Sequence, residues 1–137
     1  MIVVDTSVIV KLAIPEARSD LAAKLRLQIL GAPAIWRAEV ANVLWRKVRV
    51  GEIGEDRAAA FLRALFDGVI VTLQLDDDLV HRALAIAMAL NHPVYDCFFL
   101  ACAIDQNTVV VTDDSRFGTA VVRHGRWSKY LRMLESI

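Results

Sequence analysis

The chain has 137 residues, of which 56% are hydrophobic and 23% are charged, and its 16 basic residues balance its 16 acidic ones. This composition excludes a disordered chain and fits a single domain, residues 1–137, with a substantial core. The zero net charge argues against non-specific nucleic-acid binding driven by overall charge, but it leaves room for a locally basic face.

Nothing at the start of the chain resembles a signal peptide, because the apolar run Met1–Val4 has no basic flank and ends at Asp5. The longest uncharged apolar stretch elsewhere, Cys97–Ile104, is too short to cross a bilayer. Cys97 and Cys102 fall on different faces of an expected helix and are predicted to be reduced core residues. We therefore expect a soluble cytoplasmic protein without a membrane partner.

In chain order, short apolar strands alternate with helices. Ile2–Val4 is predicted to be a buried strand, and Thr6 and Ser7 offer N-caps for a short helix that runs through Leu12. The other elements expected in the first half are a helix over Glu16–Leu30 that ends at Gly31 and Pro33, a very short strand at Ala34–Ile35, and helices over Trp36–Val50 and Glu55–Phe66.

The second half continues the same alternation. Its expected elements are a β-branched strand at Val69–Leu73, a helix from the Asp76–Asp78 cap to Leu90, a very apolar helix over Tyr95–Asp105, a buried strand at Val109–Val111, a helix from Ser115 to Arg123 and a last strand within Tyr130–Leu134. Strands that alternate with helices along the whole length predict an α/β layered fold with a mostly parallel sheet.

Several acidic residues are expected at one edge of that sheet. Asp5 directly follows the first strand, and Asp113 and Asp114 follow a later one. The carboxyl ends of parallel strands share one edge, where ligands bind. Glu39 and Asp96 lie in the first turns of helices that begin at the same edge. Each residue taken alone is an ordinary helix cap or solvated side chain, so the case for a joint site rests on their convergence.

Carboxylates gathered in one place repel one another unless a cation lies between them. Oxygen ligands select a hard ion such as Mg²⁺ or Mn²⁺ rather than zinc. Such an ion supports phosphodiester hydrolysis, since it lowers the pKa of a bound water and neutralises charge in the transition state while a carboxylate orients the water. The sequence has no Gly-rich phosphate loop, and His81, His92 and His124 fit no catalytic triad and are predicted to be surface or turn residues.

Four segments carry a family resemblance. They are Val3–Val8, Glu39–Leu44, Val94–Asp96 followed by Leu100 and Ala101, and Val111–Phe117. In this order and at this chain length they resemble PIN-domain ribonucleases, and most closely the VapC toxins of bacterial and archaeal toxin–antitoxin pairs. The resemblance covers essentially the whole chain. It implies a three-layer α/β/α fold and a single-strand-directed endoribonuclease that depends on Mg²⁺, with Mn²⁺ as the alternative ion.

The same resemblance implies the roles of the site residues. The four acidic catalytic positions would be Asp5, Glu39, Asp96 and Asp114, with Asp5, Asp96 and Asp114 as the metal ligands. Asp114 is preferred because the family pattern reads Thr, any residue, Asp, two residues and an aromatic, which Thr112, Asp114 and Phe117 fit. The slot before Asp114 is usually small and neutral, so Asp113 stays a second candidate. The supporting residues would be Thr6, Ser7, Asn42, Thr112 and Asp113.

Basic residues are expected around an acidic pocket that binds RNA. The candidates are Lys11, Arg46, Arg116 and Arg126. The segment from Ser115 to Leu134 contains five basic residues and no acid, interleaved with Trp127 and Tyr130, which is typical of a surface that tracks phosphates and stacks on bases. Ordinary solvated charges and core aromatics explain the same pattern.

The resemblance further implies a homodimer and a small antitoxin that lies in a hydrophobic groove. Candidate groove residues are Leu12, Ile14, Leu21, Trp45 and Phe61, for which core burial is the alternative. The main competing function is a catalytically silent PIN domain that acts as an RNA-binding or scaffold module. A haloacid-dehalogenase-type phosphatase is disfavoured because Ser7 stands where its second aspartate belongs.

Overall fold

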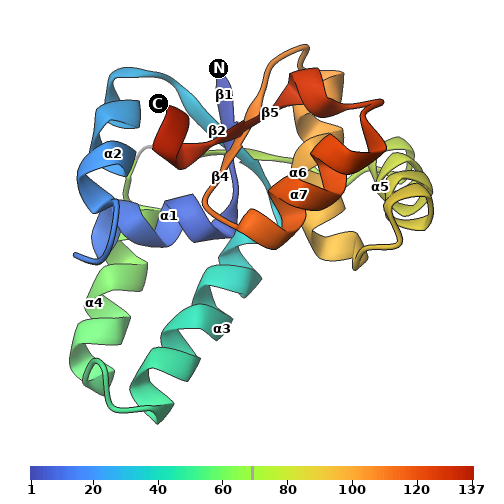
Figure 1. Ribbon diagram of the computed structural model, residues 1–137. Helices are drawn as coiled ribbons and strands as arrows, with labels where there is room; N and C mark the ends of the chain where they lie inside the picture. The colour runs from blue at the N-terminus through green and yellow to red at the C-terminus, as the bar shows by residue number, and fades with distance from the viewer. Residues whose placement is uncertain (69) are drawn as a thin grey trace.

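A five-stranded sheet lies at the centre of the computed structural model, which describes residues 1–68 and 70–137 (Figure 1). Every strand pair in it is parallel, and the strand order is β3-β2-β1-β4-β5. The strands are β1 (Ile2–Val4), β2 (Leu30–Pro33), β3 (Ile70–Leu73), β4 (Val110–Thr112) and β5 (Leu131–Met133). The α/β class expected from the alternating pattern is therefore confirmed.

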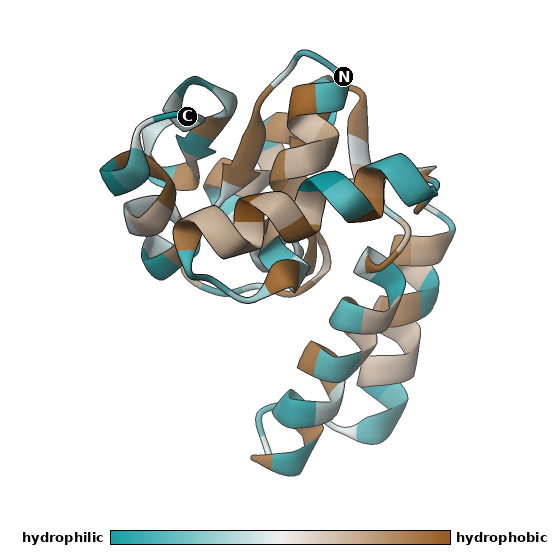
Figure 2. Cartoon of the chain, turned by 90° about the vertical axis from the view of Figure 1, so that its right-hand side faces the viewer, coloured by the Kyte–Doolittle hydropathy of each residue, from teal (hydrophilic) through white to brown (hydrophobic). Residues whose placement is uncertain are grey.

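Helices cover both faces of the sheet and complete the three layers. They are α1 (Thr6–Ala13), α2 (Ser19–Lys24), α3 (Trp36–Arg49), α4 (Glu55–Phe66), α5 (Asp77–Leu90), α6 (Val94–Asp105) and α7 (Ser115–His124). Figure 1 shows α5, α6 and α7 on one side of the sheet and α1 and α2 on the other. The antiparallel pair α3–α4 projects from this body, with hydrophobic and hydrophilic segments alternating along it (Figure 2).

Helix α6 is the centre of the core. All seven residues from Cys97 to Ala103 are buried, and the helix packs on β1, β2 and β4. A helix that is apolar all round has to be buried in this way, which fixes its backbone relative to the sheet. Within residues 1–68 and 70–137, no single helix is long and apolar enough to cross a membrane; α5 and α6 meet the criterion only as a pair bent by 118°.

The second strand lies earlier than the sequence pattern predicts. The expected strand Ala34–Ile35 is wrong, because β2 is Leu30–Pro33, all of it buried. Gly31 was read as a helix stop, but it lies within the strand, where a Cβ atom would lie 2.5 Å from Sδ of the flexible Met1 side chain. Pro33 is the last residue of the strand and lies beyond the two residues that pair with β1, Leu30 and Gly31. Val69, expected to begin the third strand, lies outside the described residues.

The long helix expected over Glu16–Leu30 is also wrong. Only α2 and a 3₁₀ turn at Leu25–Leu27 form there. Arg18 takes a left-handed conformation (φ 65°), and the Ser19 hydroxyl accepts the Glu16 N–H and donates to the Ile14 carbonyl, so the loop is fixed before the helix begins. The other expected helices and strands form within one or two residues of their predicted bounds.

Strand order positions the functional edge. Strand β1 lies in the middle of the sheet. β2 and then β3 extend the sheet from one edge of β1, and β4 and then β5 extend it from the other edge. The direction of winding therefore reverses between β1 and β4. In parallel α/β sheets, the crevice outside the carboxyl ends of two such strands is the common ligand site. Asp5 follows β1 at that crevice, and Asp113 and Asp114 follow β4.

Candidate active site

A cavity of about 470 Å³ opens at this edge of the sheet. The four carboxylates expected to form an acidic cluster all line it, although they come from four separate parts of the chain. The lining residues are Asp5, Thr6, Ser7, Ile35, Ala38, Glu39, Asn42, Val43, Arg46, Tyr95, Asp96 and Asp114. We call this space the acidic cavity.

Asp5 is the most buried acidic residue in the cavity, with 3% of its surface exposed. It caps α1, since its Oδ1 accepts the Val8 N–H (3.3 Å), and the same oxygen accepts the Ser7 hydroxyl (2.5 Å). Its Oδ2 accepts the hydroxyl of Thr112 at the end of β4. Burial raises the pKa of Asp5 to about 7, despite these three hydrogen bonds, and repulsion from Asp96 adds to the rise.

Glu39 faces the cavity from the first turn of α3. The Thr6 hydroxyl donates to its Oε1 at 2.8 Å. Burial raises the pKa of Glu39, and the charge of Asp96 raises it further, while the bond from Thr6 lowers it. Asn42 and Arg46, three and seven positions further along α3, lie on the same face of the helix and also line the cavity.

Asp113 and Asp114 have different environments. Asp114 lines the cavity and caps α7, where its Oδ1 accepts the N–H groups of Arg116 (2.9 Å) and Phe117 (3.2 Å). Asp113 accepts two bonds of 2.7 Å from the Arg18 guanidinium, and Lys11 Nζ lies 3.3 Å away. The bonds from Arg18 hold the pKa of Asp113 below its usual range. Asp114, not Asp113, therefore presents its carboxylate to the cavity, and Asp113 contributes only its backbone N–H, bonded to Ser7 Oγ (2.9 Å).

The fourth carboxylate has a histidine partner that the sequence reading missed. His92 Nε2 lies 2.7 Å from Asp96 Oδ2, and its side chain is only 9% exposed. His92 lies in a turn, as expected, but its side chain is largely buried rather than at the surface. The sequence signal for this pairing was the position of His92 in the turn just before α6, four residues before Asp96.

Of the basic residues expected to bind RNA, only Arg46 lines the cavity. Lys11 does not line the cavity: its ammonium pairs with Glu16 (2.8 Å) and Asp113 (3.3 Å), and its side chain is 10% exposed. Arg116 and Arg126 are exposed outside the cavity. The Arg126 guanidinium lies 5.1 Å from the centre of the Trp127 ring.

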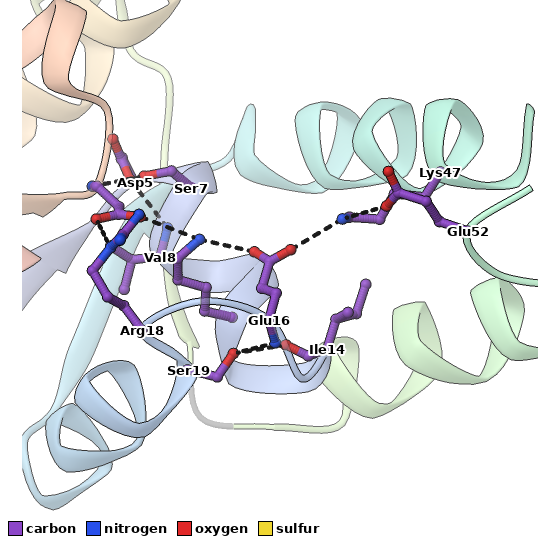
Figure 3. A network of polar contacts seen from close by, with 11 residues as sticks. Asp5, Ser7, Val8, Ile14, Glu16, Arg18, Ser19, Lys47 and Glu52 are labelled. Atoms are coloured by element: carbon purple, nitrogen blue, oxygen red, sulfur yellow. Dashed lines mark hydrogen bonds and ion pairs between the residues drawn. The ribbon is translucent and has the colours of Figure 1, made fainter. Parts of the chain in front are cut away.

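An ion-pair network begins beside the cavity, where Asp113 meets Arg18 and Lys11. From Lys11 it passes to Glu16 and on to Lys47 of α3, with 3.0 Å between Lys47 Nζ and Glu16 Oε2. Figure 3 shows Glu16 between the α1 side of the molecule and Lys47, which in turn reaches Glu52. The network ties α1 and the loop before α2 to the projecting α3–α4 pair.

The residues expected to line an antitoxin groove separate into two groups. Leu12 and Ile14 are core residues, 8% and 7% exposed, which corrects that expectation. Leu21 and Phe61 are half-buried against the core. Trp45 is 55% exposed and lines a groove of about 290 Å³ between α3 and α4.

The donor chemistry of the acidic cavity fits a hard divalent cation. Within residues 1–68 and 70–137, Asp5, Glu39 and Asp114 form no ion pair with a basic side chain. In the same part of the chain, no group of three or more His, Cys, Asp or Glu side chains lies close enough together to hold a metal ion. Carboxylates spread around a cavity suit an ion that keeps several of its waters, as Mg²⁺ does.

Comparisons with known proteins agree with this architecture. The family model of the PIN domain matches residues 2–121. Ribonuclease VapC3 from Pyrobaculum aerophilum is 35% identical over 106 residues, which are 74% of this chain and 80% of that protein.

Two solved structures share the fold. The crystal structure of PAE2754 from Pyrobaculum aerophilum has a TM-score of 0.72 at 21% identity and covers 98% of this chain and 84% of its own. A toxin–antitoxin complex from Klebsiella pneumoniae has a TM-score of 0.61 at 16% identity and covers 85% and 88% of the two chains. The family match over most of the sequence and the VapC3 relative together show that the chain belongs to the PIN-domain family, among its VapC-type members.

Proposed function

We propose that the chain is an Mg²⁺- or Mn²⁺-dependent endoribonuclease that acts in the cytoplasm as the toxin of a toxin–antitoxin pair. The observation that carries the proposal is the convergence of Asp5, Glu39, Asp96 and Asp114 in one cavity, with Asp5 buried and not paired with a cation in the described part of the chain. The name of the VapC3 relative, a ribonuclease, supports RNA as the substrate.

The residues divide into those that hold the ion and those that act on water and phosphate. Asp5, Asp96 and Asp114 would hold the cation. A bound Mg²⁺ or Mn²⁺ supplies a water of lowered pKa and neutralises charge on the phosphate. Glu39, whose pKa is raised by burial, suits acceptance of a proton from the attacking water, and the bond from Thr6 orients its carboxylate. Ser7 and Thr112 hold Asp5 in place.

RNA would cross the cavity between Arg46 and Tyr95. Arg46 is exposed on α3 and can pair with a phosphate, while Tyr95, 56% exposed at the start of α6, offers a ring on which an unpaired base can stack. The stacking contact favours a single strand, since bases inside a duplex are already stacked. Arg116 and Arg126 extend the basic surface beyond the cavity.

A cleavage assay with the purified chain tests this function. RNA should be cut in Mg²⁺ or Mn²⁺ and left intact in EDTA, and Asp5→Asn should abolish cleavage in both metals. An inert wild type that still binds RNA would favour the catalytically silent PIN domain. Hydrolysis of small phosphomonoesters without cleavage of RNA would contradict both PIN-domain functions.

A small antitoxin and a second copy of the chain are the proposed protein partners. The groove beside Trp45 between α3 and α4 is the apolar surface best suited to the antitoxin, and the Klebsiella toxin–antitoxin complex with the same fold supports a partner of this kind. The candidate antitoxin is the small protein encoded by the neighbouring gene. Trp45→Ser should weaken its binding, while cleavage of RNA by the free chain stays unchanged. Light scattering during gel filtration tests the dimer, and a monomeric mass at micromolar concentration would contradict it.

A further inference from the structure

The turn between α5 and α6 holds His92 in a fixed place. Asn91 takes a left-handed conformation (φ 50°) that ends α5, and the His92 N–H donates to the Ala87 carbonyl at 3.1 Å. Pro93 follows as the residue that begins α6. The backbone of His92 is therefore constrained on both sides, by a helix end before it and a proline after it.

The imidazole ring is constrained as well. It packs against the ring of Phe117 with 5.2 Å between ring centres and 42° between their planes. Phe117 is fully buried in α7, and its N–H donates to the carboxylate of Asp114. The His92 side chain thus bonds Asp96, and its ring packs on Phe117, the residue whose backbone N–H bonds Asp114.

The direction of the bond between His92 and Asp96 follows from its acceptor. An ionised carboxylate can only accept, so Nε2 carries the proton and donates to Oδ2 across 2.7 Å. The bond needs Nε2–H and does not need a charged ring. It occupies one oxygen of Asp96 and leaves Oδ1 for a ligand.

Among the three proposed metal ligands, Asp96 depends most on a single contact. Asp5 is held by three donors and Asp114 by two backbone N–H groups. The Asp96 side chain is 31% exposed, and His92 is its one hydrogen-bond partner in the described part of the chain. Because the backbone of α6 is locked in the core, the orientation of the carboxylate is the remaining freedom at this position.

We propose that His92 is a positioning residue, which holds the Asp96 carboxylate in the orientation that binds the divalent cation. The inference rests on the proposed function, in which Asp96 is a metal ligand. Loss of a hydrogen-bond partner behind a metal ligand weakens metal binding by roughly 10–100-fold. We expect that loss when Nε2–H is removed.

Calorimetric titration of the RNA-free protein with Mn²⁺ provides a readout other than activity. His92→Phe keeps a ring against Phe117 but has no donor, and it should weaken Mn²⁺ binding by roughly 10–100-fold. His92→Gln keeps an N–H donor and should stay within about threefold of the wild type. His124→Phe is the matched control, since His124 stacks on Trp127 outside the cavity, and its affinity should not change.

A double-mutant cycle shows whether His92 acts through Asp96. In an Asp96→Asn background, His92→Phe should produce no further loss of Mn²⁺ affinity, because the residue it positions is already gone. Equal losses in His92→Phe and His92→Gln, or a full additional loss in the double mutant, would overturn the positioning role. If wild type binds Mn²⁺ and His92→Phe binds it equally well, the inference fails and the proposed function stands. If wild type binds neither Mn²⁺ nor Mg²⁺, both fail.

Discussion

Two neighbouring regions at the end of β4 differ in whether their carboxylates are paired with cationic side chains. Asp113 enters the ion-pair network, where each carboxylate meets a guanidinium or an ammonium group. Asp114, the next residue, enters the acidic cavity, where Asp5, Glu39 and Asp114 meet hydroxyls and backbone N–H groups instead. The same residue type thus serves structure on one side of the chain and is left without a countercharge on the other.

The pKa values show what this difference means. Bonds from Arg18 lower the pKa of Asp113, so its charged form stabilises the fold. Burial raises the pKa of Asp5 to about 7, so its charged form destabilises the fold at neutral pH. A charge that costs stability and lies in a cavity is a good indicator of a functional site. Substitutions that affect one region and leave the other unchanged test this contrast.

The largest effect should separate the adjacent aspartates. Asp114→Asn should reduce RNA cleavage at least about a thousandfold, because it removes a charged ligand of the proposed metal, worth several kcal/mol. Asparagine still caps α7, so the melting temperature should change little. Asp113→Asn is the matched control and should cut RNA within a few-fold of wild type. Initial cleavage rates of both variants measure this, and equal losses in the two would end the distinction between the regions.

Stability without metal should depend on pH through Asp5. Its pKa is raised from 3.8 to about 7 on folding, so the folded chain keeps a proton that the unfolded chain releases between these values. The free energy of unfolding in EDTA should therefore fall as pH rises from about 4 to about 7, by at most about 4 kcal/mol. Glu39, whose pKa is also raised, acts in the same direction. Urea unfolding across this range measures the slope, and a slope unchanged in Asp5→Asn would contradict the assignment.

A smaller effect is expected at the rim of the cavity. Tyr95→Ala should raise KM for RNA by roughly 5–100-fold, which corresponds to about 1–3 kcal/mol for loss of one stacked base. Tyr95→Phe should restore the wild-type KM, because the ring is kept. Hydrolysis of a phosphodiester that carries no base should be the same in all three proteins. Trp45→Ala, equally exposed but outside the cavity, is the control, and a matching rise in its KM would argue against stacking at Tyr95.

The smallest effect should come from the network. Glu16→Gln breaks the link between Lys11 and Lys47 and should lower the free energy of unfolding by about 1 kcal/mol or less, since the side chains are partly exposed. Cleavage should be unchanged. A large loss of activity in this variant would show that the network also sets the geometry of the cavity.

The sequence alone predicts those elements whose hydrophobic pattern matches their burial in the fold. The apolar runs of β1 and β4 and the uniformly apolar α6 locate the sheet edge, and the carboxylates that follow them locate the cavity. Strand β2 was missed because Gly31 and Pro33 read as chain breakers, whereas both lie within the strand and Gly31 packs beside the Met1 side chain. A contact between residues 1 and 31 leaves no local signal.

Ion pairs between side chains far apart in the sequence also cannot be predicted from the hydrophobic pattern. Of the two ion-pair partners of Lys11, Glu16 is close in sequence, but Asp113 lies about a hundred positions away. The family pattern favours Asp114 over Asp113, but the physical cause, the pairing of Asp113 with Arg18 95 positions away, has no signature in the sequence. His92 differs, since its bond to Asp96 spans only four residues and a helix-start pattern could have revealed it.

The bond from Thr112 to Asp5 has a consequence for synthesis of the protein. The two residues are 107 positions apart, so Asp5 is translated early and its partner late. β1 remains without its neighbour β4 until most of the chain has been made. A nascent chain therefore cannot assemble the cluster of four carboxylates, and any product truncated before β4 lacks Asp114 altogether.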